Sequence, residues 1–187
     1  MDRRAFLASG AALALAPGIS LSQNRVEKLR LAGARQSLVG AAYPATEVWA
    51  YNGTVPGPAL RFKQGERLRV EIQNSLPVGT TVHWHGVLLP SGMDGVGGVS
   101  QKSIQPGETF KYEFTLRQHG TLMYHSHHDE MTQIGMGMTG MIVIHPRNPT
   151  GPRPDRDFAL MLHEWAIEVG TMRPDPNEMT DFNMLTI

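Results

Sequence analysis

The stretches Thr81-Val82-His83-Trp84-His85-Gly86 and Gly120-Thr121-Leu122-Met123-Tyr124-His125-Ser126-His127 decide the fold prediction. In a β-strand, alternate residues point to the same face, so each His-x-His pair presents two imidazoles to one side, about 7 Å apart along the strand. Val82 and Trp84 then point to the opposite side. We therefore predict two strands that pack a hydrophobic core with one face and present histidines on the other.

A single His-x-His pair is weak evidence for a metal site. With 8 histidines among 187 residues, random placement gives roughly 0.3 such pairs. Two pairs, each in an alternating segment, are a stronger signal. If the two strands are neighbours, four neutral imidazoles converge, and imidazole binds copper, zinc, iron and nickel.

From Val26 onward the chain consists of short alternating segments separated by glycine and proline. Residues 67–72 and 111–116 alternate polar and apolar side chains, as strands with one buried face do. Turn signals recur about once in ten residues, the spacing of a Greek-key β-sandwich. A helical turn with Asp129 as its N-cap is predicted over 129–134, and a buried strand over 141–144.

Three strings carry a resemblance to a known family: "TVHWHGVLLPSGMDGV", "IQPGETFKYEFTL" and "HGTLMYHSHHDEMTQIGMGMTGMIVIHP". They resemble the N-terminal cupredoxin domain of multicopper oxidases, which include laccases, ascorbate oxidase and copper-resistance oxidases. The resemblance runs from Leu29 to Pro146. It implies an all-β, Greek-key sandwich of cupredoxin type (plastocyanin-like) over residues 24–148. A linker over 149–156 and the incomplete start of a second cupredoxin domain over 157–187 would follow, with a strand at 158–165.

The resemblance also implies a cofactor and a ligand set. Multicopper oxidases take electrons from a substrate at a blue copper and reduce O2 to water at a trinuclear copper cluster. Four histidines of the first domain and four of the last hold that cluster. By resemblance, His83 binds the type 2 copper, His85 and His125 share one type 3 copper, and His127 binds the other. Asp94 matches an acidic residue near the type 2 copper that passes protons, although an Asp-Gly pair is also common in plain turns.

The other histidines and the methionines receive plainer interpretations. His128 breaks the two-residue alternation and should leave the metal face, and the sequence gives no reason to make ligands of His119, His145 and His163. Clustered methionines could bind Cu(I), but core filling is the favoured interpretation; they are Met123, Met131, Met136, Met138 and Met141. Met123 stands where the family usually has tryptophan.

Composition restricts the partners. The formal net charge is zero and no segment is strongly basic, so nucleic acid is not an expected partner. The chain has no cysteine, which removes disulfides and the thiolate that blue copper requires. We therefore expect a truncated oxidase, inactive by itself, whose cluster is completed by a C-terminal cupredoxin domain in cis. The intact enzyme would use O2 and a reducing substrate that this sequence does not identify.

The N-terminus predicts export. Met1-Asp2-Arg3-Arg4-Ala5-Phe6-Leu7 places two arginines before an apolar run that Pro17-Gly18 ends, too short for a membrane span. It resembles a twin-arginine signal, predicted over residues 1–22, with a Sec signal as the alternative. The expected location is periplasmic or otherwise exported.

Two functions from other classes stay open. One is a stand-alone periplasmic copper-binding or carrier protein that uses the four histidines and nearby methionines. The other is a mononuclear zinc or copper hydrolase, which would need a general base, and only Asp94 or Glu130 is available for that role.

Overall fold

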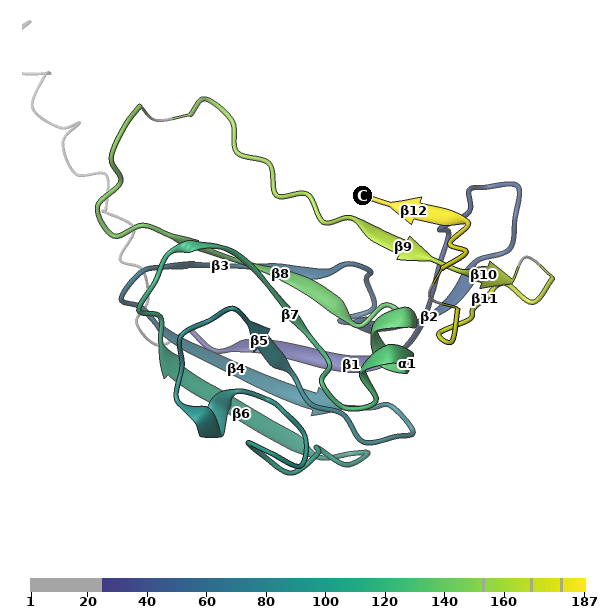
Figure 1. The fold of residues 1–187 in the computed structure, drawn as a ribbon, viewed down its shortest axis with the longest axis horizontal. Coiled ribbons are helices and arrows are strands. Elements are labelled where there is room, and N and C mark those ends of the chain that lie inside the picture. Colours follow the sequence, from purple (N-terminus) through teal and green to yellow (C-terminus); the bar gives the residue numbers. More distant parts are fainter. Residues whose placement is uncertain (1–24, 153, 169, 179) are drawn as a thin grey trace, which may run out of the picture.

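Two four-stranded β-sheets packed face to face form most of the molecule (Figure 1). The computed structural model describes residues 25–152, 154–168, 170–178 and 180–187, so the predicted signal over 1–22 lies outside the described residues. Within the described ranges, no helix is long and apolar enough to cross a membrane.

The first sheet has the strand order β2-β1-β4-β6 and the second the order β3-β8-β7-β5. In each sheet one pair is parallel, β1 with β4 and β3 with β8, and the other pairs are antiparallel. The predicted all-β sandwich of cupredoxin type is confirmed. The strands are β1 (Glu27–Gln36), β2 (Thr46–Tyr51), β3 (Gly57–Lys63), β4 (Arg67–Asn74), β5 (His83–His85), β6 (Thr109–Thr115), β7 (Gly120–His125) and β8 (Thr139–His145).

The segments in which polar and apolar residues alternate form strands, as predicted. In β4, Leu68, Val70 and Ile72 are buried, while the polar residues between them face outward. On that outer face Arg67 Nε and Arg69 Nε each donate to Glu113 Oε1 of β6 at 2.7 Å, and these hydrogen bonds lower the pKa of Glu113 to about 2. One face of the β4–β6 pair is therefore core and the other is solvated.

Aromatic side chains fill the core beneath β5. Trp84 is fully buried, and its ring centre lies 5.5 Å from that of Tyr112 and 5.9 Å from that of Tyr124. Burying an aromatic side chain of this size is worth about 2–3 kcal/mol. Trp84 thus anchors a strand of only three residues, because it is the central residue between His83 and His85.

The single α-helix among the described residues, α1 (Glu130–Gly135), lies where a helical turn was predicted. Asp129 occupies the N-cap position as predicted, but its side chain makes no capping hydrogen bond. A side-chain cap requires extended backbone at the N-cap residue. Asp129 instead has a left-handed φ of 46°.

The strand predicted at 158–165 forms only over β9 (His163–Trp165), which pairs with β12 (Met184–Thr186). Residues 158–162 are not in a strand, and their apolar side chains Phe158, Leu160 and Leu162 are exposed. The other short pair is β10 (Ile167–Glu168) with β11 (Arg173–Pro174).

The segment after the long loop folds back onto β2, close to α1 (Figure 1). Trp165, Ile167 and Met172 are buried against Val48 and Ala50 of β2. The predicted division into a cupredoxin domain over 24–148, a linker and a second domain from 157 stays a prediction. What is observed is that these C-terminal residues cover the outer face of β2.

His163 makes stability depend on pH. Its ring packs against that of Trp165 at an angle of 34° with 4.2 Å between centres, its Nδ1 lies 3.2 Å from Thr139 Oγ1, and burial lowers its pKa to about 4. The unfolded chain, with a histidine pKa near 6.5, binds this proton first as pH falls. Stability should therefore decline between pH 6.5 and pH 4, by about 3 kcal/mol from His163 alone.

Urea denaturation of wild type and His163→Phe across that pH range measures this contribution. The variant keeps an aromatic ring beside Trp165 but cannot be protonated, so its stability should depend less steeply on pH. The remaining slope comes in part from His125, whose pKa burial also lowers. An identical slope in both proteins would rule His163 out as the source.

Candidate metal centre

The histidine-bearing strands β5 and β7 are hydrogen-bonded neighbours. In their antiparallel register His83 faces His125 and His85 faces Met123, while His127 follows two residues beyond His125. The ring centre of His83 lies 5.6 Å from that of His85, 5.3 Å from that of His125 and 5.2 Å from that of His127. The predicted convergence of four imidazoles is thus observed.

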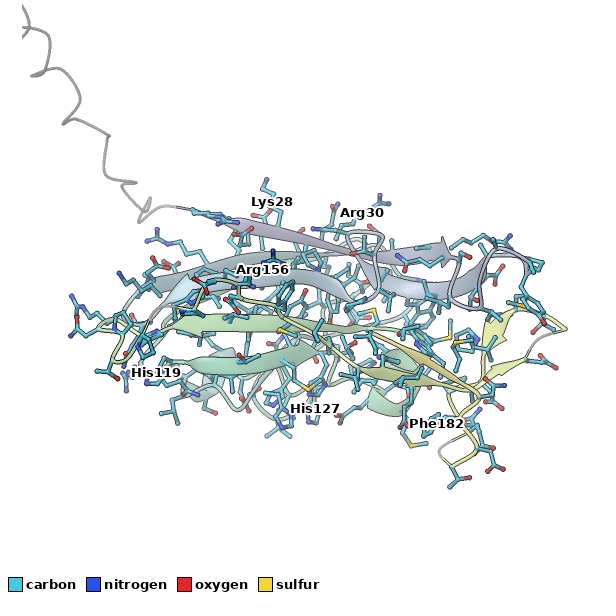
Figure 2. The ribbon with its side chains drawn as sticks, turned by 90° about the horizontal axis from the view of Figure 1, so that it is seen from above. Lys28, Arg30, His119, His127, Arg156 and Phe182 are labelled. Atoms are coloured by element: carbon cyan, nitrogen blue, oxygen red, sulfur yellow. The ribbon has the colours of Figure 1, made fainter. Side chains whose placement is uncertain are left out.

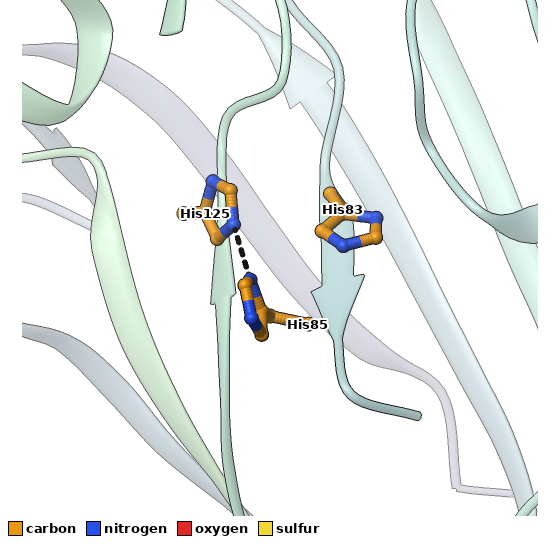
Figure 3. Close-up of side chains that lie close together, drawn as sticks. All are labelled: His83, His85 and His125. Carbon is orange, nitrogen blue, oxygen red and sulfur yellow. Dashed lines mark hydrogen bonds between the residues drawn. The ribbon is translucent and has the colours of Figure 1, made fainter. Parts of the chain in front are cut away.

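Three of the four rings also bring nitrogen atoms together. One ring nitrogen each from His83, His85 and His125 lies within 4.8 Å of the others. The shortest approach, 3.2 Å, joins His85 Nδ1 and His125 Nε2 (Figure 3). His127 lies outside this group of three. Imidazole nitrogens in this arrangement fit a nitrogen-binding transition metal such as copper or zinc.

Two backbone carbonyls fix which nitrogen faces the cluster. His83 Nδ1 lies 2.7 Å from the carbonyl oxygen of Asp94, and His125 Nδ1 lies 2.8 Å from that of Ser126. A carbonyl oxygen can only accept, so both Nδ1 atoms donate a hydrogen in these bonds. In the neutral rings Nε2 then carries the lone pair. Such carbonyl-oriented histidines are usual among metal ligands.

Burial divides the cluster into a closed and an open side. His125 is only 2% exposed, and burial lowers its pKa, so its ring is neutral near pH 7 as a metal ligand must be. His83 is half-buried, His85 is exposed, and 35% of the His127 side chain is accessible. Figure 2 shows His127 on the opposite side of the sandwich from Lys28 and Arg30.

Asp94 and Glu130 are the carboxylates beside the cluster. Asp94 follows the short 3-10 turn η1 (Ser91–Met93), and its Oδ1 lies 3.4 Å from His83 Nδ1, farther than its own carbonyl oxygen. Glu130, at the start of α1, has one oxygen 3.5 Å from His125 Nδ1 and the other 3.6 Å from His127 Nε2.

Sequence reasoning considered Glu130 only as the base of a hydrolase. Its position three residues after His127, on a predicted helical turn, was the available signal that it would return toward the histidines.

His128 and three of the five methionines lie as expected. His128 turns from the cluster, and its Nδ1 makes a 2.9 Å hydrogen bond with Ser103 Oγ. Met136, Met138 and Met141 are buried, as core filling requires, whereas Met131 is 53% exposed.

Comparisons with known proteins agree on one family. Residues 35–149 match the family model described as "Multicopper oxidase". Copper resistance protein A of Escherichia coli is 42% identical over 117 residues, which cover 63% of this chain and 19% of that protein. A copper resistance protein A homolog of Pseudomonas syringae pv. tomato is 34% identical over 180 residues, which cover 89% and 30%. The chain therefore spans less than a third of these relatives.

Solved structures show the same similarity. A multi-copper oxidase from Pseudomonas thermotolerans superposes with a TM-score of 0.74 and 38% identity, over 80% of this chain and 35% of that one. Lac15 from a marine microbial metagenome superposes with a TM-score of 0.75 and 31% identity, over 85% and 41%.

Gly95 brings the Asp94 loop against β5, and replacing it tests how that loop holds His83. Gly95 has φ +76°, and a Cβ there would overlap the Val82 carbonyl group, 1.9 Å from its oxygen. Gly98 has nearly the same φ, +77°, with nothing within 4 Å of a Cβ. Gly98→Ala should lose only the conformational term of about 1 kcal/mol.

Gly95→Ala adds the steric overlap, so we expect a total loss of about 3 kcal/mol or more. The clash should also move the Asp94 carbonyl away from His83. Urea denaturation of both variants measures the difference. Equal losses would show that the loop can retreat from β5 without strain.

Proposed function

The chain belongs to the multicopper oxidase family, and from this premise we propose that it supplies half the histidine ligands of a trinuclear copper cluster. The observation that carries the proposal is the group formed by His83, His85 and His125, with ring nitrogens within 4.8 Å of one another. The donors are imidazoles, and carbonyl groups turn those of His83 and His125 so that Nε2 faces the cluster. This donor set fits copper.

The proposed assignment distributes the ligands over three ions. His83 would bind the type 2 copper, His85 and His125 would share one type 3 copper, and His127 would bind the other. The 3.2 Å approach of His85 Nδ1 and His125 Nε2 supports a shared ion for that pair. The position of His127 outside the compact group supports a separate ion.

Bound copper would supply the one-electron redox chemistry by which such a cluster reduces O2 to water with electrons from an oxidised substrate. The histidines of this chain would hold the copper, and neighbouring carbonyl groups orient their rings. The carbonyl groups of Asp94 and Ser126 keep a hydrogen on Nδ1 of His83 and His125, which leaves Nε2 free to bind. We propose that the Asp94 carboxylate, 35% exposed beside His83, holds and releases protons there.

The other half of the site would come from residues beyond these 187. These 187 residues contain no cysteine, and in the proposed assembly a C-terminal cupredoxin domain in cis would supply the blue copper thiolate and the remaining histidines. The exposed ring of His85 and the accessible side of His127 leave room for such ligands. The reducing substrate, a phenol, Cu(I) or another donor, would be chosen in that domain.

Copper binding by the chain itself tests the ligand set. Cu(II) added to the purified chain should give an electron paramagnetic resonance spectrum of nitrogen ligation, with no intense thiolate absorption. His125→Ala removes the ligand that contacts His85, so we expect copper affinity to fall by at least about tenfold.

His128→Ala is the matched control, because His128 is the adjacent histidine and points away toward Ser103. It should bind copper nearly as wild type does. Unchanged affinity in His125→Ala would refute the ligand assignment. Three tightly bound ions in the chain alone, with sustained O2 uptake, would refute the half-site.

We also propose export through the twin-arginine route, on the basis of Arg3-Arg4-Ala5-Phe6-Leu7. Replacing Arg3 and Arg4 by lysine keeps the positive charge but removes the guanidinium pair that this signal requires. The precursor should then accumulate in the cytoplasm, as cell fractionation would measure. Unaltered arrival of the double variant in the periplasm would favour the Sec alternative.

A further inference from the structure

Gln133 is a fully buried glutamine that contacts both histidine-bearing segments. It is the one buried residue of α1. Its Oε1 accepts hydrogen bonds from Thr80 Oγ1 at 2.7 Å and from Ser126 Oγ at 2.6 Å, and its Nε2 donates to the Gly79 carbonyl at 2.8 Å. Thr80 and Ser126 are themselves fully buried. One amide therefore joins the segment that leads into β5 to the segment that leaves β7.

The network has one consistent arrangement of hydrogens. The Gly79 carbonyl can only accept, so the amide NH2 of Gln133 must face it, and Oε1 must face the two hydroxyl groups. Both hydroxyl groups then donate to Oε1, which leaves Ser126 Oγ as the acceptor for the backbone N–H of His128 at 3.3 Å. A buried network with all members satisfied is rigid and selects a single geometry.

Two short connections lead from this network to the histidines. The carbonyl of Ser126 accepts the hydrogen bond from His125 Nδ1, so the placement of Ser126 sets the orientation of the His125 ring. Thr81, next to Thr80, accepts the backbone N–H of His127 at its Oγ1, 3.3 Å away. The segments 79–81 and 125–128 therefore cannot shift against each other without breaking bonds to or beside Gln133.

We propose that Gln133 is a positioning residue that fixes the spacing of the two histidine pairs and the orientation of the His125 ring. The proposal deepens the copper-binding function proposed above and rests on it for its purpose. The positioning itself is a property of the metal-free protein. It can therefore be measured without copper.

The decisive variant is Gln133→Met in the full 187-residue chain. Methionine matches glutamine in length but neither donates nor accepts strongly, so Ser126 and Thr80 lose their common partner. In metal-free wild type, nitrogen-15 NMR should show His125 as the Nδ1–H form with a protected ring hydrogen. In Gln133→Met we expect that protection to fall at least about tenfold, as the hydrogen bond to Ser126 opens.

The matched control is Asn74→Leu, an equivalent change at another fully buried amide. Asn74 Nδ2 donates to the carbonyls of Val78 and Ile104, both at 2.8 Å, and its Oδ1 accepts from Leu76 N–H. None of these bonds reaches residues 125–128. This variant should lose stability in urea as Gln133→Met does but keep the His125 ring signal. If Gln133→Met fails to fold, Ser126→Ala removes only one hydroxyl from the network and should give a smaller loss of protection.

Copper affinity, measured by competition with a chelator, provides the second readout. We expect Gln133→Met to bind Cu(II) about 10- to 100-fold more weakly than wild type, and Asn74→Leu to stay within about twofold. An unchanged His125 signal and unchanged affinity in both Gln133→Met and Ser126→Ala would overturn the positioning role. A wild type that binds no copper, but whose His125 signal still depends on Gln133, would refute the proposed function and support the positioning role.

Discussion

The antiparallel register of β5 and β7 is the constraint on which the rest of the structure depends. It places His83 opposite His125 on one face and Trp84 opposite Tyr124 on the other. A slip by one residue would turn the aromatic rings outward and the imidazoles into the core, because strand side chains alternate. The hydrophobic free energy of burying Trp84 and Tyr124 thus also holds the histidines in register. Core packing and metal-site geometry are enforced by the same pairing.

Strand β8, the neighbour of β7 on the side away from β5, shows how tightly the register is fixed. Gly140 of β8 faces Tyr124, and any Cβ at Gly140 would overlap the Tyr124 ring. The tyrosine hydroxyl reaches past it and donates to the Pro58 carbonyl at 2.8 Å. Trp84, Tyr124 and Gly140 are thus successive members of one row across the three strands, and the missing side chain of Gly140 leaves the space that the Tyr124 ring occupies. The sequence around the histidines therefore encodes the packing of the core as well as the placement of the imidazoles.

Local patterns were enough to predict the sandwich and the convergence of the histidines, since alternation and turn residues act over a few positions. Local patterns are not enough where contacts between distant parts of the chain determine the conformation. Asp129 is the N-cap of α1 as predicted, but its backbone is left-handed and its side chain forms no capping hydrogen bond. Of the strand expected at 158–165, the apolar run 158–162 has no strand partner among the described residues. The approach of Glu130 to His125 likewise depends on where α1 packs, whereas its spacing of three residues from His127 is visible in the sequence.

Orientation of the ligands is a separate problem from their proximity. Strand pairing alone would leave each imidazole free to rotate about its side-chain bonds, and a loosely held ligand loses entropy when it binds a metal. Here the rotation of His83 and His125 is restricted in advance by carbonyl groups that belong to flanking loops, not to the strands. Two contacts in turn restrict those loops: Gly95 packs closely against the chain at Val82, and Ser126 donates a hydrogen bond to Gln133. His85 and His127 have no such carbonyl bond among the described contacts and lie on the accessible side. The cluster therefore combines a buried half, held by carbonyl groups, with an exposed half whose rings are less constrained.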